Sequence, residues 1–250
     1  MNRKEESMRE GGKRLAAVMA ILVDMAHDGV RADEINARAE KEILARACRV
    51  AFKGYGDDED VPFPSTICFS LNNEVVHGIP TPEKMIRNGD VVKIDIGLIH
   101  EGFYLDMART FCVGPASPQA QKLVAVTKES LDRGIAAVRD GATLGDYARA
   151  VQAYVEQSGF SVVRNLVGHG IGTKLHEEPH IPNYVSPKAQ KIFFREGMTA
   201  ALEPMVNAGG YETILGKDGW TFFTKDGSLS AHFEDTILVT KKGAEILTRA

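Results

Sequence analysis

The chain has 250 residues, of which 44% are hydrophobic and 26% are charged, and its formal net charge is −4. Such a chain can bury one large core or two small ones. It has no block of lysine or arginine, so we exclude DNA or RNA binding. It has no apolar run near its start long enough to span a bilayer, so we also exclude a membrane protein. Mixed charges ahead of the first apolar run argue against a secretory signal, and three cysteines without a CxxC pair favour a reducing compartment, the cytoplasm.

Apolar residues recur at helical spacing in the first fifty residues, and Gly29 separates two such runs. A polar, acidic loop from Gly54 to Asp60 follows, and the pattern then changes to short β-rich runs. Two more helices and a final region of strands and glycine-rich loops complete the chain. The predicted elements are helices over 15–25 and 32–50, strands within 65–71 and 91–114, and helices over 118–139 and 144–157.

No linker rich in glycine, serine or proline divides the chain, and no internal repeat is visible. We therefore expect one α+β domain over residues 1–250. The succession of helices, strands, helices and strands is also compatible with two similar halves that share a sheet, which the sequence alone leaves open.

The segment from Val91 to Gly114 predicts a β-hairpin with two carboxylates. Strand alternation places Asp95 on the less apolar of two faces. If the chain reverses over residues 100 and 101, Asp95 lies directly opposite Asp106. Like charges so placed destabilise a sheet unless one is protonated or a cation lies between them, which favours a metal. For the hairpin alone, a solvated surface pair is the alternative.

Three other segments carry candidate ligands. His169 lies between two glycines, Glu203 lies in an apolar run that ends at a proline, and Glu234 lies in a predicted strand. Taken singly, these residues have ordinary explanations: a structural histidine, a glutamate on an edge strand and a glutamate that faces solvent.

Taken together with the two aspartates, these residues supply four carboxylates and one imidazole. Such a set suits two divalent ions, and ligand type does not choose among cobalt, manganese, iron(II) and zinc. Two ions about 3.5 to 4 Å apart could share a water or hydroxide and polarise a peptide carbonyl, so hydrolysis is the predicted reaction.

Five ordered blocks of the sequence resemble type I methionine aminopeptidases: NEVVHGIP, KIDIGLIHEGFYLDMARTF, GHGIGTKLHEEP, GMTAALEPMVNAGG and DGWTFFTKDGSLSAHFEDTILVT. The resemblance covers nearly the whole chain. It implies the pita-bread fold, a pseudo-symmetric α+β domain with a curved antiparallel sheet covered by helices. It also implies removal of the initiator methionine from nascent polypeptides with a small second residue, by a monomer for which the ribosome is a candidate partner.

The resemblance assigns roles to the candidate ligands. Asp106 and Glu234 would bridge two metal ions, Asp95 would chelate one of them, and His169 and Glu203 would complete the other. Glu203 would also accept a proton from the nucleophilic water.

Two histidines and an apolar pocket are assigned to the substrate by the same resemblance. His77 would contact the scissile region, and His176 would hydrogen-bond the carbonyl and steady the developing oxyanion. Without the resemblance, either would be interpreted as a core histidine. The side chains expected to line the methionine pocket, where soft and aromatic surfaces suit a thioether, are Phe63, Cys68, Leu175 and Trp220.

The sequence departs from the family pattern at three places. Asp235 stands where bacterial members commonly have histidine, which puts the tuning of the metal ligands in question. Leu105 stands where a small residue is common, and the acidic loop GDDEDV replaces an aromatic, glycine-containing segment. Two alternatives remain: an X-Pro aminopeptidase or prolidase, which usually has an additional N-terminal domain, and a non-catalytic pita-bread binding protein.

Overall fold

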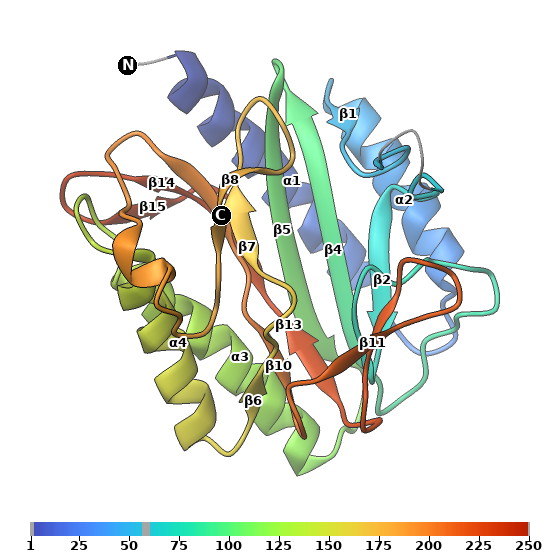
Figure 1. Cartoon of the computed structure of the whole chain (residues 1–250). Helices are drawn as coiled ribbons and strands as arrows, with labels where there is room; N and C mark the ends of the chain where they lie inside the picture. The colour runs from blue at the N-terminus through green and yellow to red at the C-terminus, as the bar shows by residue number, and fades with distance from the viewer. Residues whose placement is uncertain (1–2, 57–60, 250) are drawn as a thin grey trace.

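The computed structural model describes residues 3–56 and 61–249 and contains four α-helices and fifteen strands there (Figure 1). The first half comprises α1 (Arg3–Met25), α2 (Ala32–Ala45), β1 (Arg49–Val50), β2 (Ile67–Leu71), β3 (Glu74–Val76), β4 (Val91–His100) and β5 (Phe103–Cys112). The second half comprises α3 (Pro118–Ala136), α4 (Leu144–Gln157), β6 (Ser161–Val162), β7 (Gly168–Gly170), β8 (Glu177–Ile181), a short 3-10 turn (Ala189–Lys191), β9 (Thr199–Leu202), β10 (Met205–Asn207), β11 (Thr213–Leu215), β12 (Phe222–Thr224), β13 (Ser230–His232), β14 (Glu234–Val239) and β15 (Ala244–Ile246).

The four predicted helices are present, with errors at three boundaries: α1 begins at Arg3 instead of residue 15, α3 ends at Ala136 instead of residue 139, and α2 ends early. Helix α2 ends at Ala45, although the apolar spacing continues to Val50. Ala47 has a φ of 55°, outside the helical region, and Arg49 and Val50 pair with β4 as a short strand. Pairing with the sheet therefore overrides the helical period in this segment.

An antiparallel sheet forms the centre of the molecule. Its main strand order is β1-β4-β5-β14-β9-β7-β8, with β2 paired to β4 and β15 paired to β14. Two three-stranded sheets, β13-β10-β6 and β11-β12-β3, accompany it. Strands from the N-terminal and C-terminal halves thus meet where β5 pairs with β14.

The predicted hairpin forms, but the predicted register was wrong. The chain reverses over Glu101 and Gly102, whose φ values of 49° and 88° are those of a two-residue hairpin turn. Asp95 therefore pairs with Ala108, and Asp106 pairs with Gly97. The shift is by two residues, so the two aspartates stay on one face of the sheet as diagonal neighbours.

The hydrophobic core divides into two main clusters that follow the two halves of the chain. One lies beneath α1 and α2, and the other beneath α3 and α4. In Figure 1, α1 passes behind β4 and β5, while α3 and α4 lie behind the strands of the second half. Leu105 is on this helical side, facing Gly11 of α1, so its neighbour Asp106 points to the opposite face.

No helix among the described residues is long and apolar enough to cross a membrane.

Gly12 lets helix α1 approach the C-terminal segment closely. A β-carbon at this position would lie 2.0 Å from the backbone oxygen of Leu247. Alanine ordinarily stabilises a helix interior by about 1 kcal/mol relative to glycine. We predict that Gly12→Ala instead destabilises the protein and lowers the free energy of unfolding by about 1 to 3 kcal/mol. The added β-carbon would force the backbone of α1 or of the C-terminal segment to move. Urea denaturation measures it, and increased stability would contradict this packing.

Candidate metal centre

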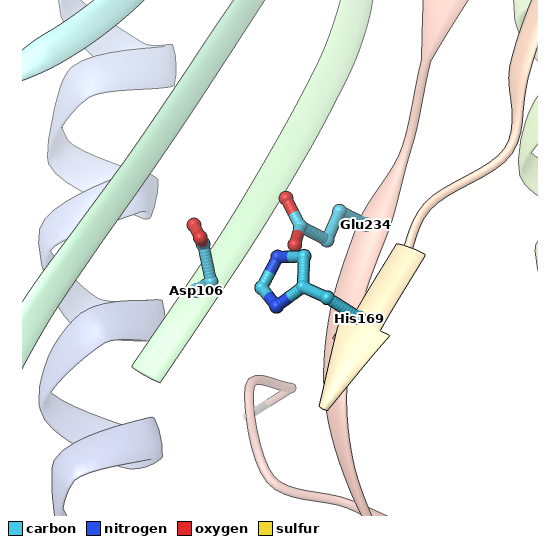
Figure 2. Close-up of side chains that lie close together, drawn as sticks. All are labelled: Asp106, His169 and Glu234. Atoms are coloured by element: carbon cyan, nitrogen blue, oxygen red, sulfur yellow. The ribbon is translucent and has the colours of Figure 1, made fainter. Parts of the chain in front are cut away.

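Three side chains from separate strands form the centre of the site. Ligand atoms of Asp106 (β5), His169 (β7) and Glu234 (β14) all lie within 4.8 Å of one another, and all three residues are buried. Figure 2 shows these side chains gathered between their three strands. Asp95 and Glu203 lie outside this closest group but line the same cavity.

Strand β7 presents His169 through a very close backbone approach. A β-carbon at Gly168 would lie 2.5 Å from the oxygen of Ala201, and one at Gly170 would lie 2.4 Å from the oxygen of Glu178. The two glycines are therefore required by packing. The Nδ1 of His169 lies 2.9 Å from the Gly170 carbonyl oxygen, so an Nδ1–H donates there and Nε2 keeps its lone pair for the cavity.

The aspartate and glutamate backbones are held by neighbouring side chains. Thr236 Oγ1 accepts a hydrogen bond from the Asp106 amide at 3.0 Å and donates to the Asp106 carbonyl at 2.8 Å. Asn183 donates to the Glu203 carbonyl at 3.1 Å and accepts from the Tyr147 hydroxyl at 2.6 Å. These bonds fix the positions from which the carboxylates enter the cavity.

Several polar atoms of the cluster are buried without a hydrogen-bond partner. One carboxylate oxygen each of Asp95, Asp106 and Glu234 is in this state, and so is Nε2 of His232. Leaving such groups unsatisfied costs about 1 to 3 kcal/mol each, and more when they are charged. Oxygen and imidazole donors that converge without partners fit a divalent cation.

Burial and mutual repulsion oppose ionisation of these carboxyls. Burial raises the pKa of Asp95 to about 6, and the charge of Glu203 acts in the same direction. Burial, together with Asp95 and Glu203, also raises the pKa of Asp106 well above its usual value. The pKa of Glu234 rises for the same reasons, whereas burial lowers the pKa of His169 to about 3. Without a cation, the cluster therefore favours protonated carboxyls more than exposed carboxyls do, and it keeps this imidazole neutral at pH 7.

The cavity brings together all eleven residues that the sequence singled out. The five candidate ligands share its wall with His77, His176, Phe63, Cys68, Leu175 and Trp220. Trp220 lies edge-on to Phe63, with ring centroids 5.2 Å apart, and His169 lies edge-on to His176 at 4.3 Å. Thus an apolar compartment adjoins the acidic cluster.

Comparison with known proteins agrees with this architecture. The model of metallopeptidase family M24 matches residues 6–241. Methionine aminopeptidase B of Synechocystis is 44% identical over 99% of this chain and 90% of its own length, and the methionine aminopeptidase of Aquifex aeolicus is 43% identical over 98% and 96%. The chain belongs to metallopeptidase family M24.

Solved structures support the same assignment. The methionine aminopeptidase of Thermotoga maritima superposes with a TM-score of 0.95 and 40% identity, covering 100% of this chain and 98% of that one. The prolidase of Pyrococcus furiosus shares the fold at a TM-score of 0.78 and 21% identity, and this chain covers 65% of it. The predicted pita-bread fold of family M24 is therefore confirmed.

Some residues around this M24 site were not singled out by sequence analysis. His232 Nε2 lies 3.5 Å from a Glu203 oxygen, and the imidazole is buried. The Tyr55 hydroxyl lies against Nδ1 of His176, and Tyr55 and Phe52 also line the cavity. His232 adjoins the Glu234 strand in the sequence, which was a usable signal, but nothing in the sequence pattern connects Tyr55 with His176.

The departures from the family pattern lie away from the cavity or outside the described residues. Asp235 points to the face opposite Glu234, where its carboxylate accepts hydrogen bonds from Arg109 at 2.7 Å and Arg249 at 2.7 Å. Arg109 also donates to the Glu234 carbonyl at 2.7 Å. Asp235 thus anchors the backbone of the Glu234 strand. Residues 57–60 of the acidic loop lie outside the described residues.

Metal binding should release protons, because the carboxyl pKa values are raised and a cation favours the ionised forms. We predict that affinity for manganese falls as pH decreases through about 6, the pKa of Asp95. Calorimetric titrations in buffers of different ionisation enthalpy measure the proton count. His169 is already neutral, so the protons come from carboxyls, and Asp95→Asn should release fewer. Binding without proton release at pH 6 would contradict the raised pKa values.

Proposed function

We propose that this chain is a methionine aminopeptidase that hydrolyses the first peptide bond of polypeptides beginning with methionine. The observation that carries the proposal is the union, in one cavity, of a buried acidic cluster with an apolar, sulfur- and aromatic-lined compartment. The methionine aminopeptidases that match nearly the full chain support the same activity.

The proposed centre would hold two divalent ions of cobalt, manganese, iron(II) or zinc. Its ligands would be Asp95, Asp106, His169, Glu203 and Glu234. The support is the donor chemistry and the buried unpartnered oxygens. When bound, the ions supply Lewis acidity and an activated water for peptide hydrolysis.

The remaining groups act on protons and on substrate position. Glu203, whose pKa burial raises well above its usual value, is suited to accept a proton from water and pass it on. Its oxygens lie 3.6 Å from Nε2 of His169 and 3.5 Å from Nε2 of His232, so the carboxylate reaches the cluster. His176 would donate to the substrate carbonyl, and the Tyr55 hydroxyl at Nδ1 would orient its ring.

His77 is placed for substrate binding by a costly backbone conformation. It follows β3 directly and has a φ of 58°, which non-glycine residues rarely adopt. Burial lowers its pKa to about 4, so the imidazole is neutral at pH 7. With Phe63, Cys68, Leu175 and Trp220 it would enclose the methionine side chain. We further propose that residues 1–250 form one catalytic domain, that the enzyme works as a cytoplasmic monomer, and that the ribosome is a candidate partner.

Removing a central ligand should abolish activity while leaving the fold intact. We predict that Asp106→Asn and His169→Ala each lower metal-dependent release of methionine by at least about 100-fold. Both variants should keep the wild-type circular dichroism spectrum, because Asp106→Asn removes a carboxyl whose ionisation is opposed by burial and His169→Ala only truncates a side chain that lines the cavity. Glu212→Gln, on the surface opposite Lys225, serves as the matched control. Undiminished turnover by either ligand variant would rule out this metal centre.

Substrate choice separates the proposal from the X-Pro peptidases, with which the chain shares the fold at 21% identity. We predict that Met-Gly and Met-Ala peptides are cleaved at least about tenfold faster, in kcat/KM, than Met-Lys peptides. The rings of Tyr55 and His169 pack edge-on against His176, with centroids 4.9 and 4.3 Å away, and we propose that this packing admits only a small second side chain. Ala-Pro peptides should not be cleaved. Preferential cleavage of Ala-Pro would replace the proposal with the prolidase alternative.

A further inference from the structure

Lys93 is a buried lysine that the proposed reaction does not use. It lies in β4, on the same face as Asp95, with only 1% of its surface exposed. Its Nζ donates to two backbone carbonyls, those of Asn72 and Ser230, each at 3.0 Å. Neither acceptor is a carboxylate. Burying an amine that can carry charge among neutral carbonyls is costly, so its retention calls for a reason.

The two carbonyls belong to segments that flank the candidate metal centre. Asn72 forms the turn between β2 and β3, and β3 leads directly to His77. Ser230 begins β13, which ends at His232 and continues through Phe233 into β14 and Glu234. The Ser230 amide also donates to the Asn72 carbonyl at 3.0 Å. Lys93 therefore joins three segments that are far apart in sequence.

Strand β13 needs such a connection because it leaves the main sheet. It pairs with β10 in a separate three-stranded sheet, and the pairing of β14 with β5 begins only at Glu234. Between β13 and the β4-β5 hairpin, side chains replace the backbone ladder. Thr110 exchanges hydrogen bonds with the backbone of His232, and Lys93 reaches Ser230.

We propose that Lys93 is a positioning residue of the metal centre: it fixes β13, and with it His232 and Glu234, against the strands that carry Asp95 and Asp106. The inference rests on the proposed metallopeptidase function. It does not depend on protonation, because the ammonium ion and the neutral amine can both donate the two bonds.

The Lys93→Met variant removes the hydrogen-bond donors and keeps most of the side-chain volume. A positioning role and a purely electrostatic role of Lys93 predict opposite changes in its metal affinity. If charge alone mattered, removing an ammonium group two residues along β4 from Asp95 would strengthen metal binding. The positioning role instead predicts manganese binding at least about tenfold weaker, as for other residues that orient metal ligands. Competition with a fluorescent chelator measures the affinity without turnover. Unchanged or tighter binding would overturn the proposal.

A second pair of measurements tests the positioning role even if Lys93→Met fails to fold. It also separates failure of this inference from failure of the proposed function. Lys93→Ala leaves space for an added amine, and we expect propylamine, but not propanol, to restore manganese affinity to the folded fraction. Failure of the amine to restore affinity would overturn the positioning role. Lys84→Met, which removes the lysine paired with Glu74, is the control and should bind manganese like wild type. If the wild-type protein bound no manganese, the proposed function itself would be contradicted. If the wild-type protein and the Lys93 variants bound manganese equally well, only the positioning role of Lys93 would be contradicted.

Discussion

The convergence of buried acidic side chains is the constraint on which the structure depends. Asp95, Asp106, Glu203 and Glu234 reach one cavity with raised pKa values, and several of their oxygens have no hydrogen-bond partner. Such an arrangement destabilises a protein unless protons or cations compensate it. In a fold with this arrangement, a bound cation relieves the repulsion between the carboxylates and satisfies their free oxygens. Cation binding is therefore favourable, and it is the physical basis of the proposed enzyme.

The scaffold serves this convergence by joining strands from both halves of the chain. The β4-β5 hairpin supplies two aspartates, and β7 and β14 supply a histidine and a glutamate from the second half. The opposite face is occupied by helices and by the pair of arginines on Asp235, which hold the sheet from behind. The open face is left for the cavity. Hydrogen bonds from Thr236, Asn183 and Arg109 then fix the backbone at three of the acidic positions.

Local patterns in the sequence predicted much of this fold, and the residues expected at the site do line one cavity. The errors have physical causes. The predicted hairpin register differs from the observed one by two residues. The turn forms at Glu101 and Gly102 because Glu101 adopts a positive φ, and the alternation of apolar residues does not reveal this. The end of α2 was missed because pairing with β4 overrides helical spacing at Val50. Lys93 and Tyr55 contact segments that are distant in the sequence, and no spacing within one element encodes those contacts.

Anomalous scattering from crystals soaked in manganese tests the central claim most directly, because it locates cations independently of any substrate. The account predicts two peaks in the cavity, about 3.5 to 4 Å apart, one of them between the side chains of Asp106, His169 and Glu234. A cavity without anomalous density at saturating manganese, with the acidic side chains hydrogen-bonded to one another instead, would contradict it.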